Sequence, residues 1–123
     1  ACIIGTPGWE IIPTLQPQPG DFIVAKDKYD AFYHTDLDSI LKKLKVKKLL
    51  LSGVLTNNCV RATAEGAHYR GYQITLIADC CGATSYLKDK THEEIQDITL
   101  RDLKERMYQT EIMNLEEIEK IIK

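Results

Sequence analysis

The sequence predicts an α/β domain in which a mostly parallel sheet is covered by helices on both faces, giving three layers. Short apolar runs alternate along the chain with longer segments whose apolar residues recur at helical spacing. Strands that alternate with helices in this way are typical of parallel sheets. The chain has 123 residues, which is enough for one domain with one core, and we assign residues 1–123 to that domain.

Four segments are expected to form the strands. Each is short and apolar, and most contain β-branched residues. They are residues 21–25, 48–52 and 73–78, and a shorter strand over residues 110–113. Residues 1–20 hold all four prolines and three of the seven glycines, and this composition predicts a loop. Because four strands are few and the chain opens on a long loop, we expect the N-terminal part of the domain to be missing.

Four helices are expected between and after these strands. Thr35, Thr91 and Asn114 are candidate N-cap residues, and Glu94 completes a capping box with Thr91. The corresponding helices cover residues 37–44, 92–107 and 115–122. The fourth helix covers residues 59–70 and is expected to end at Gly71, the residue type that most often follows a helix C-terminus.

The composition excludes several classes of partner. The net charge is −2 and no basic face dominates, which argues against nucleic acid and anionic membranes as partners. No apolar run reaches the ~18 residues of a membrane span, and the chain does not begin with a signal-peptide pattern. We therefore expect neither nucleic acid nor a membrane as a partner.

The cysteines and histidines do not predict a disulfide framework or a metal site. Cys2, Cys59, Cys80 and Cys81 lack C-x-x-C spacing, which indicates reduced thiols in a cytoplasm. The three histidines are not paired at ligand spacing. We therefore expect no metal and no cofactor.

Cys59 is the candidate nucleophile. It is expected at a helix N-terminus just after strand 48–52, where unpaired N–H groups and the helix dipole favour a thiolate. In open α/β sheets, ligands bind at the carboxyl ends of the strands. Backbone N–H groups near Leu55 and Cys59 could then receive the negative charge of a carbonyl oxygen. The alternative is that Cys59 is a small buried apolar residue and that the turn before it is an ordinary connection.

Lys26 follows the first expected strand, so it lies at the same edge of the sheet as Cys59. An ammonium group there would stabilise a thiolate or transfer protons. The alternative is a solvated loop lysine, and Lys28 competes for the role. Four aromatic residues either line an apolar pocket or pack beneath the loops: Trp9, Tyr29, Phe32 and Tyr33. Asp79 also ends a strand, and we interpret it as structural.

Three segments, in this order, resemble the isochorismatase-like cysteine hydrolases. Residues 5–11 (G-T-P-G-W-E-I) resemble the G-T-x-G-x-E loop of that family. Residues 26–32 (K-D-K-Y-D-A-F) resemble its lysine segment, K-x-x-Y-S-x-F, with Asp30 in place of the serine. Residues 53–64 (G-V-L-T-N-N-C-V-R-A-T-A) resemble its nucleophile segment. The resemblance covers essentially the whole chain.

The resemblance implies a Rossmann-like sheet and a Cys-Lys-Asp triad, with Cys59 as the nucleophile and Lys26 as the lysine. It also implies a cis peptide before Leu55, with the amides of Leu55 and Cys59 as the oxyanion hole. Members hydrolyse nicotinamide, carbamoyl and ureido compounds through a thioester-type intermediate, so the resemblance implies a small-molecule substrate. The members that cleave isochorismate lack the cysteine, so Cys59 favours an amidase. Members commonly form dimers or tetramers, and we expect a homo-oligomer.

One element of the family pattern has no counterpart here. The triad aspartate of the family lies on a strand upstream of the G-T-x-G loop, and no aspartate of this chain matches it. We therefore expect the isolated chain to be inactive and poorly stable. Two alternatives to a hydrolase remain open: a non-catalytic fragment or relative used for oligomerisation or binding, and a redox-sensing thiol at Cys59.

Overall fold

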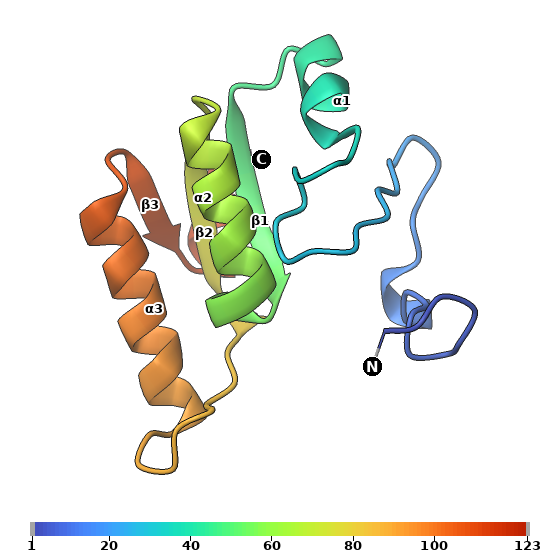
Figure 1. The fold of residues 1–123 in the computed structure, drawn as a ribbon. Helices are drawn as coiled ribbons and strands as arrows, with labels where there is room; N and C mark the ends of the chain where they lie inside the picture. The colour runs from blue at the N-terminus through green and yellow to red at the C-terminus, as the bar shows by residue number, and fades with distance from the viewer. Residues whose placement is uncertain (1, 123) are drawn as a thin grey trace.

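The structure is a computed structural model that describes residues 2–122. Strands and helices follow one another along the chain (Figure 1). In chain order they are η1 (Pro13–Leu15), α1 (Leu37–Lys43), β1 (Lys48–Val54), η2 (Thr56–Val60), α2 (Arg61–Tyr69), β2 (Gln73–Gly82), α3 (His92–Arg106), β3 (Thr110–Met113) and α4 (Leu115–Ile122). This alternation confirms the α/β class. Among residues 2–122, no helix has both the length and the apolar character needed to cross a membrane.

The sheet has three parallel strands in the order β1-β2-β3. Ile74 of β2 pairs with Leu49 of β1 on one side and with Thr110 of β3 on the other. Because β2 is the central strand, four of its consecutive residues are buried, from Ile74 to Ile77. The expected parallel sheet is confirmed.

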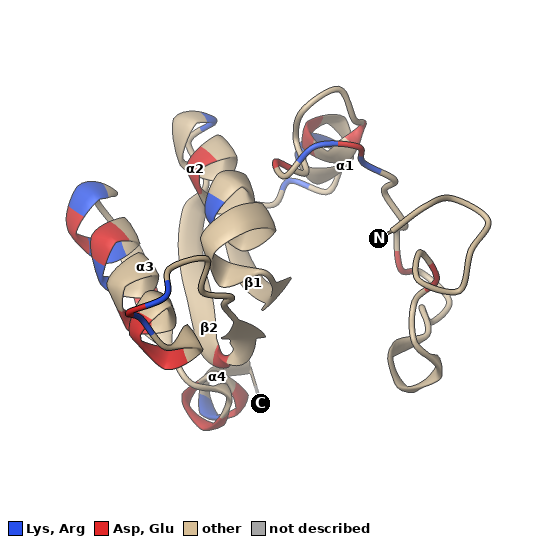
Figure 2. Cartoon of the chain, turned by 60° about the horizontal axis from the view of Figure 1, so that its bottom comes forward, with Lys and Arg blue, Asp and Glu red and all other residues tan. Residues whose placement is uncertain are grey.

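Helices cover both faces of β2. Figure 1 shows α2 and α3 on one face, and Figure 2 shows α4 on the other. The core on the first face is built from residues of β2, α2, α3 and the segments beside them: Phe32, Val60, Ala64, Ala67, Tyr72, Ile74, Leu76, Leu100, Leu103 and Met107. On the second face, Ile118 of α4 is only 4% exposed. These are the three layers that the sequence predicts.

The prediction of a strand over residues 21–25 is wrong. These residues have no regular structure, and Phe22 and Ile23 are exposed. In the described chain, η1 is the only regular element before α1, and the N-terminal segment lies apart from the sheet (Figure 1). A strand forms only where a neighbouring strand accepts and donates its backbone hydrogen bonds. In residues 2–122, β1 pairs only with β2, and no strand bonds to residues 21–25.

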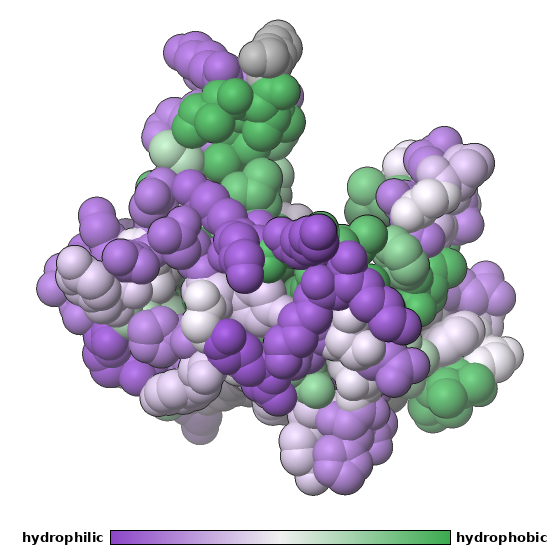
Figure 3. Space-filling view, turned by 90° about the horizontal axis from the view of Figure 1, so that it is seen from above, coloured by the Kyte–Doolittle hydropathy of each residue, from purple (hydrophilic) through white to green (hydrophobic). Residues whose placement is uncertain are grey.

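β1 is an edge strand of the described sheet, with one covered face. Its residues alternate between partly buried and exposed. Leu49 and Leu51 pack against the core, whereas Leu50 and Val54 are exposed on the other face. Figure 3 shows that apolar surface remains in separate patches among the hydrophilic residues.

Two strands extend further than expected. β1 continues to Val54, through Gly53 at a φ of +124°, a conformation that glycine adopts without steric cost. Its register with β2 shifts there, because Leu51 pairs with Leu76 but Gly53 pairs with Cys81. β2 continues to Gly82, so Asp79 lies within a strand and not in a loop.

The helix termini follow the local signals closely. Thr91 and Glu94 form the expected capping box at the start of α3. The side chain of Asn114 accepts a hydrogen bond from the N–H of Glu117 in α4. Gly71 follows α2 at a φ of +87°. At α1, however, the N-cap residue is Asp36 and not Thr35, and its side chain makes no capping hydrogen bond.

Ion pairs connect α2 to α3. Arg61 donates to Asp102 at 2.6 Å, and Arg106 donates to the same oxygen of Asp102 at 3.0 Å. Arg61 also pairs with Glu65 on its own helix. Figure 2 shows residues of both charge signs along these two helices. The network fixes the first turn of α2, which follows directly after Cys59.

Candidate active site

The candidate site begins where β1 ends. The peptide bond between Val54 and Leu55 is cis, and the next residues form η2, a short π-helical turn. The carbonyl of Leu55 accepts hydrogen bonds from the N–H groups of Asn58 and Val60, which closes the turn. Cys59 lies inside this turn, and α2 begins two residues later. The helix that was expected to begin at Cys59 therefore begins two residues later, at Arg61.

Two asparagines of the turn are anchored to the loop after β2. The side chain of Asn57 donates to the carbonyl of Thr84 at 2.8 Å and accepts from its N–H at 3.2 Å. Asn58 donates to the hydroxyl of Tyr86 at 2.7 Å. The local sequence alone does not distinguish these asparagines from ordinary turn residues. The only local signal of their role is the pair of amide side chains immediately before the cysteine.

Lys26 and Cys59 lie together in the structure. The Nζ atom of Lys26 is 3.5 Å from the Sγ atom of Cys59, although 33 positions separate the two residues. The same Nζ donates to the backbone carbonyl of Lys28 at 2.9 Å. Lys28 therefore contributes a carbonyl oxygen that holds the ammonium group of Lys26. The polar contact to the thiol comes from Lys26.

A cavity of about 230 Å³ lies beside these two residues. Its walls come from the end of β1, from η2 and α2, and from the loop that carries Lys26. The lining residues are Lys26, Ala31, Leu51, Ser52, Gly53, Val54, Cys59, Val60 and Thr63. The thiol is partly buried, so a small molecule in this cavity reaches it.

None of the four aromatic candidates lines the cavity beside Cys59. Phe32 is a core residue, 3% exposed, whose ring stacks on Tyr72 at 5.8 Å. Of the two roles expected for Phe32, it therefore has packing in the core, and it does not line the cavity beside Cys59. Tyr29 and Tyr33 are exposed and do not line the cavity beside Cys59. Trp9 lines a second cavity of about 570 Å³, and Lys26 lines both cavities.

The other thiols have different surroundings. Cys2 is exposed, whereas Cys80 and Cys81 are partly buried in β2, and none of the four cysteines forms a disulfide. Burial raises the pKa of the Cys81 thiol. Asp79 accepts a hydrogen bond from the N–H of Leu115 at the start of α4. This bond gives Asp79 the structural role that the sequence predicts.

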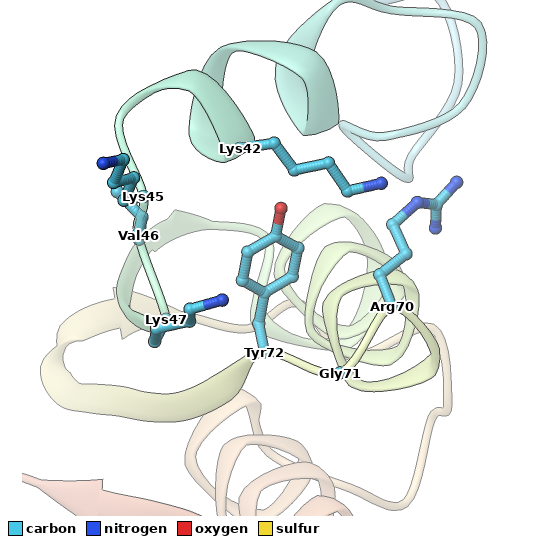
Figure 4. A pocket seen from close by; sticks show the side chains of 7 residues that line it. All are labelled: Lys42, Lys45, Val46, Lys47, Arg70, Gly71 and Tyr72. Atoms are coloured by element: carbon cyan, nitrogen blue, oxygen red, sulfur yellow. The ribbon is translucent and has the colours of Figure 1, made fainter.

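A cavity of about 280 Å³ lies at the amino ends of the strands, away from Cys59 (Figure 4). Basic side chains surround the Tyr72 ring there. Two of them have partners in the fold: Lys42 pairs with Asp38 at 2.7 Å, and Arg70 donates to the carbonyl of Gly66. The Tyr72 hydroxyl donates to Asp38 at 2.7 Å. Burial and this bond raise the pKa of Tyr72 to about 12.

Comparison with known proteins identifies relatives that include named hydrolases. The family model for the isochorismatase domain matches residues 1–114. The ureidoacrylate amidohydrolase of Methylorubrum extorquens is 36% identical over 75 residues, which are 61% of this chain and 30% of that protein. This chain therefore spans about a third of the length of that relative.

Solved structures agree over nearly the whole chain. An isochorismatase-like hydrolase from Alkaliphilus metalliredigens superposes with a TM-score of 0.84 at 33% identity, over 97% of this chain and 61% of that one. The N-carbamoylsarcosine amidase from Thermoplasma acidophilum superposes with a TM-score of 0.75 at 29% identity, over 92% of this chain and 59% of that one. With a family model matching nearly all of its sequence and these structural neighbours, the chain belongs to the isochorismatase family.

Proposed function

We propose that this chain carries the nucleophile of a cysteine hydrolase that cleaves a C–N bond of a small amide, ureido or carbamoyl compound. The observation that carries the proposal is the 3.5 Å contact between Lys26 Nζ and Cys59 Sγ at the wall of a cavity. A thiol paired with a cation beside a cavity suits a nucleophile better than a structural cysteine.

The names of two relatives favour particular classes of C–N bond as the one that is cleaved. These two are named as a ureidoacrylate amidohydrolase and an N-carbamoylsarcosine amidase. Both names describe hydrolysis of a carbonyl group bonded to nitrogen. We therefore propose a ureido or carbamoyl nitrogen as the leaving group, ahead of a simple carboxamide.

The proposed chemistry has two steps. The Cys59 thiolate attacks the carbonyl carbon, the C–N bond breaks, and the leaving nitrogen takes a proton from Lys26, which leaves a thioester on Cys59. Water then attacks the thioester carbonyl and the C–S bond breaks, which releases the product as a carboxylate or carbamate anion and restores the thiolate. One proton of that water returns to Lys26, and the other is taken up by the released amine or ammonia.

The turn offers a place for the negative charge on the carbonyl oxygen. The backbone N–H groups of Leu55 and Cys59 belong to the turn that separates β1 from α2. N–H groups held in a fixed turn stabilise an oxyanion without reorganising during the reaction. Asn57 and Asn58 support this role, because their side-chain hydrogen bonds hold the turn against the loop after β2.

The second cavity is proposed to hold the part of the substrate that does not react. It shares Lys26 with the cavity beside Cys59 and is lined by Trp9, Ile11 and Ile23, together with Glu10 and Gln16. An apolar wall with a few polar groups is typical of a small-molecule site.

The test is turnover by the complete protein that carries this chain. A panel of amide, ureido and carbamoyl compounds would be assayed with the native protein, with Cys59→Ala, and with Cys80→Ala as the matched thiol control. We expect Cys59→Ala to abolish turnover and Cys80→Ala to keep it. Acid-quenched native protein should also carry an acyl group on the peptide containing Cys59. Turnover that survives in Cys59→Ala would overturn the proposal.

A further inference from the structure

A single hydroxyl on α2 holds the loop that carries Lys26. The Oγ1 atom of Thr63 accepts a hydrogen bond from the N–H of Ala31 at 3.0 Å and lies 3.4 Å from the carbonyl of Tyr29, to which it donates. Thr63 lies four residues after Cys59, and both side chains line the cavity of about 230 Å³. The cysteine and the anchor of the lysine loop are thus one helical turn apart.

A close approach of loop and helix reinforces this anchor. A Cβ atom placed on Gly66 would lie 2.6 Å from Oδ1 of Asp30 and 2.7 Å from its Oδ2. The same Oδ1 accepts a hydrogen bond from the N–H of Phe32 at 2.8 Å, so the carboxylate has little freedom to move away. The buried ring of Phe32 holds the end of the loop in the core.

These contacts hold the loop segment that follows Lys26 and supplies the carbonyl to which its ammonium group donates. Lys26 is exposed and has a long flexible side chain, so its position beside a thiol costs conformational entropy unless its surroundings are ordered. Its ammonium is held on the carbonyl of Lys28, which immediately precedes the anchored residues 29–32. Movement of this loop away from α2 would carry that carbonyl away from Cys59.

We propose that Thr63 is a positioning residue for the reaction, which holds the 26–32 loop on α2 so that Lys26 stays beside Cys59. The proposal rests on the proposed function for its catalytic meaning, but not for its test. A Lys26 ammonium favours the thiolate, and the thiolate is the species that reacts with alkylating agents. Cys59 alkylation therefore reports the Lys26–Cys59 contact without any substrate.

The test is a double-mutant cycle in the complete protein. Thr63→Val keeps the side-chain shape and removes both hydrogen bonds, whereas Thr63→Ser keeps the hydroxyl. Iodoacetamide alkylation of the Cys59 peptide would be followed by mass spectrometry in native protein, in both Thr63 variants, in Lys26→Met and in Thr63→Val/Lys26→Met. Circular dichroism would establish that each variant is folded.

We expect Thr63→Val to slow alkylation of Cys59 about fivefold, the size of effect that loss of one or two hydrogen bonds gives. Thr63→Ser should retain most of the native rate. In the Lys26→Met background, Thr63→Val should not slow the alkylation of Cys59 any further, because effects that act through one contact are not additive. An equal slowing with and without Lys26 would mean that Thr63 only supports the fold, and this result or an unchanged rate in Thr63→Val would overturn the proposal.

A second route covers the case in which Thr63→Val does not fold. Gly66→Ala should displace Asp30 and slow Cys59 alkylation in the native background, but it should cause no further slowing in an Asp30→Ala background, where the clash is gone. An equal slowing in both backgrounds, or no slowing in either, would mean that the loop does not set the position of Lys26. Failure of the proposed function has a separate signature, which is turnover by Cys59→Ala, so the two outcomes are distinguishable.

Discussion

The Nζ atom of Lys26 lies 3.5 Å from the Sγ atom of Cys59, with its other contact on the carbonyl of Lys28. The contact joins a loop before α1 to the turn between β1 and α2. In the proposed reaction, this ammonium is the proton donor to the leaving nitrogen.

Replacing Lys26 by methionine should lower kcat in the complete protein by roughly a hundredfold or more, because general acid catalysis contributes effects of that order. The assay is steady-state hydrolysis of the best substrate from the panel. Lys28→Met is the matched control, since Lys28 contributes its backbone carbonyl to the site and should keep most of the activity. Equal losses in the two variants would show that the charge of the loop matters and that the 3.5 Å contact does not.

Gly66 and Asp30 should be coupled in stability. Alanine is favoured over glycine inside a helix by about 1 kcal/mol, but here its Cβ would meet the Asp30 carboxylate. Gly66→Ala should therefore fail to stabilise the native protein. In an Asp30→Ala background the same substitution should raise the free energy of unfolding by about 1 kcal/mol. Urea unfolding of the four proteins measures the coupling, and additive effects would contradict the close approach.

Tyr72 should make stability depend on pH in the alkaline range. Its pKa is raised from the ordinary value of about 10 to about 12, first by burial and then by the bond to Asp38. Because the folded state holds this proton more tightly, the stabilisation is complete below pH 10 and is lost as the pH rises toward 12. Tyr72→Phe should flatten the fall in unfolding free energy between pH 10 and about 12, where the slope due to this residue corresponds to at most one proton per molecule. Tyr108→Phe, at an 84% exposed side chain, should leave the fall unchanged.

Asp102 should make the unfolding free energy depend on pH in the acidic range. Its pKa is lowered by the hydrogen bond from Arg106 and by the charges of Arg106 and Arg61. The stabilisation is therefore present above the ordinary aspartate pKa of about 4 and is lost as the pH falls through the lowered value. Asp102→Asn should reduce the loss of stability below pH 4 in chemical unfolding. Asp89→Asn, in the loop before α3, is the control; a reduction of equal size there would show that overall charge is responsible.

Both arginine partners of Asp102 are partly exposed, so salt should weaken this network. The difference between native protein and Asp102→Asn should therefore shrink as sodium chloride is raised. A difference that stays constant would mean that packing and not charge joins α2 to α3 at this point.

The sequence by itself determined three of the helix termini and the class of the fold. The Thr91–Glu94 capping box, the Asn114 cap and Gly71 after α2 are all found where the sequence predicts them. Each of these signals acts within about four residues, so the chain needs no distant partner to satisfy them. The segments that resemble the family likewise predicted its shared α/β fold, and their agreement in order and spacing is a property of the sequence alone.

Tertiary structure decided which apolar segments became strands and which side chains met. Residues 21–25 have strand-like composition but no neighbouring strand in the described chain, whereas β2 runs on to Gly82 because β1 pairs with it there. Phe32 lies in the core, where its ring stacks on that of Tyr72, 40 positions later in the chain. Thr63 and Gly66 carried no signal of contact with residues 29–31. Hydrogen bonds and packing between distant segments depend on the closed fold, which local sequence patterns do not contain.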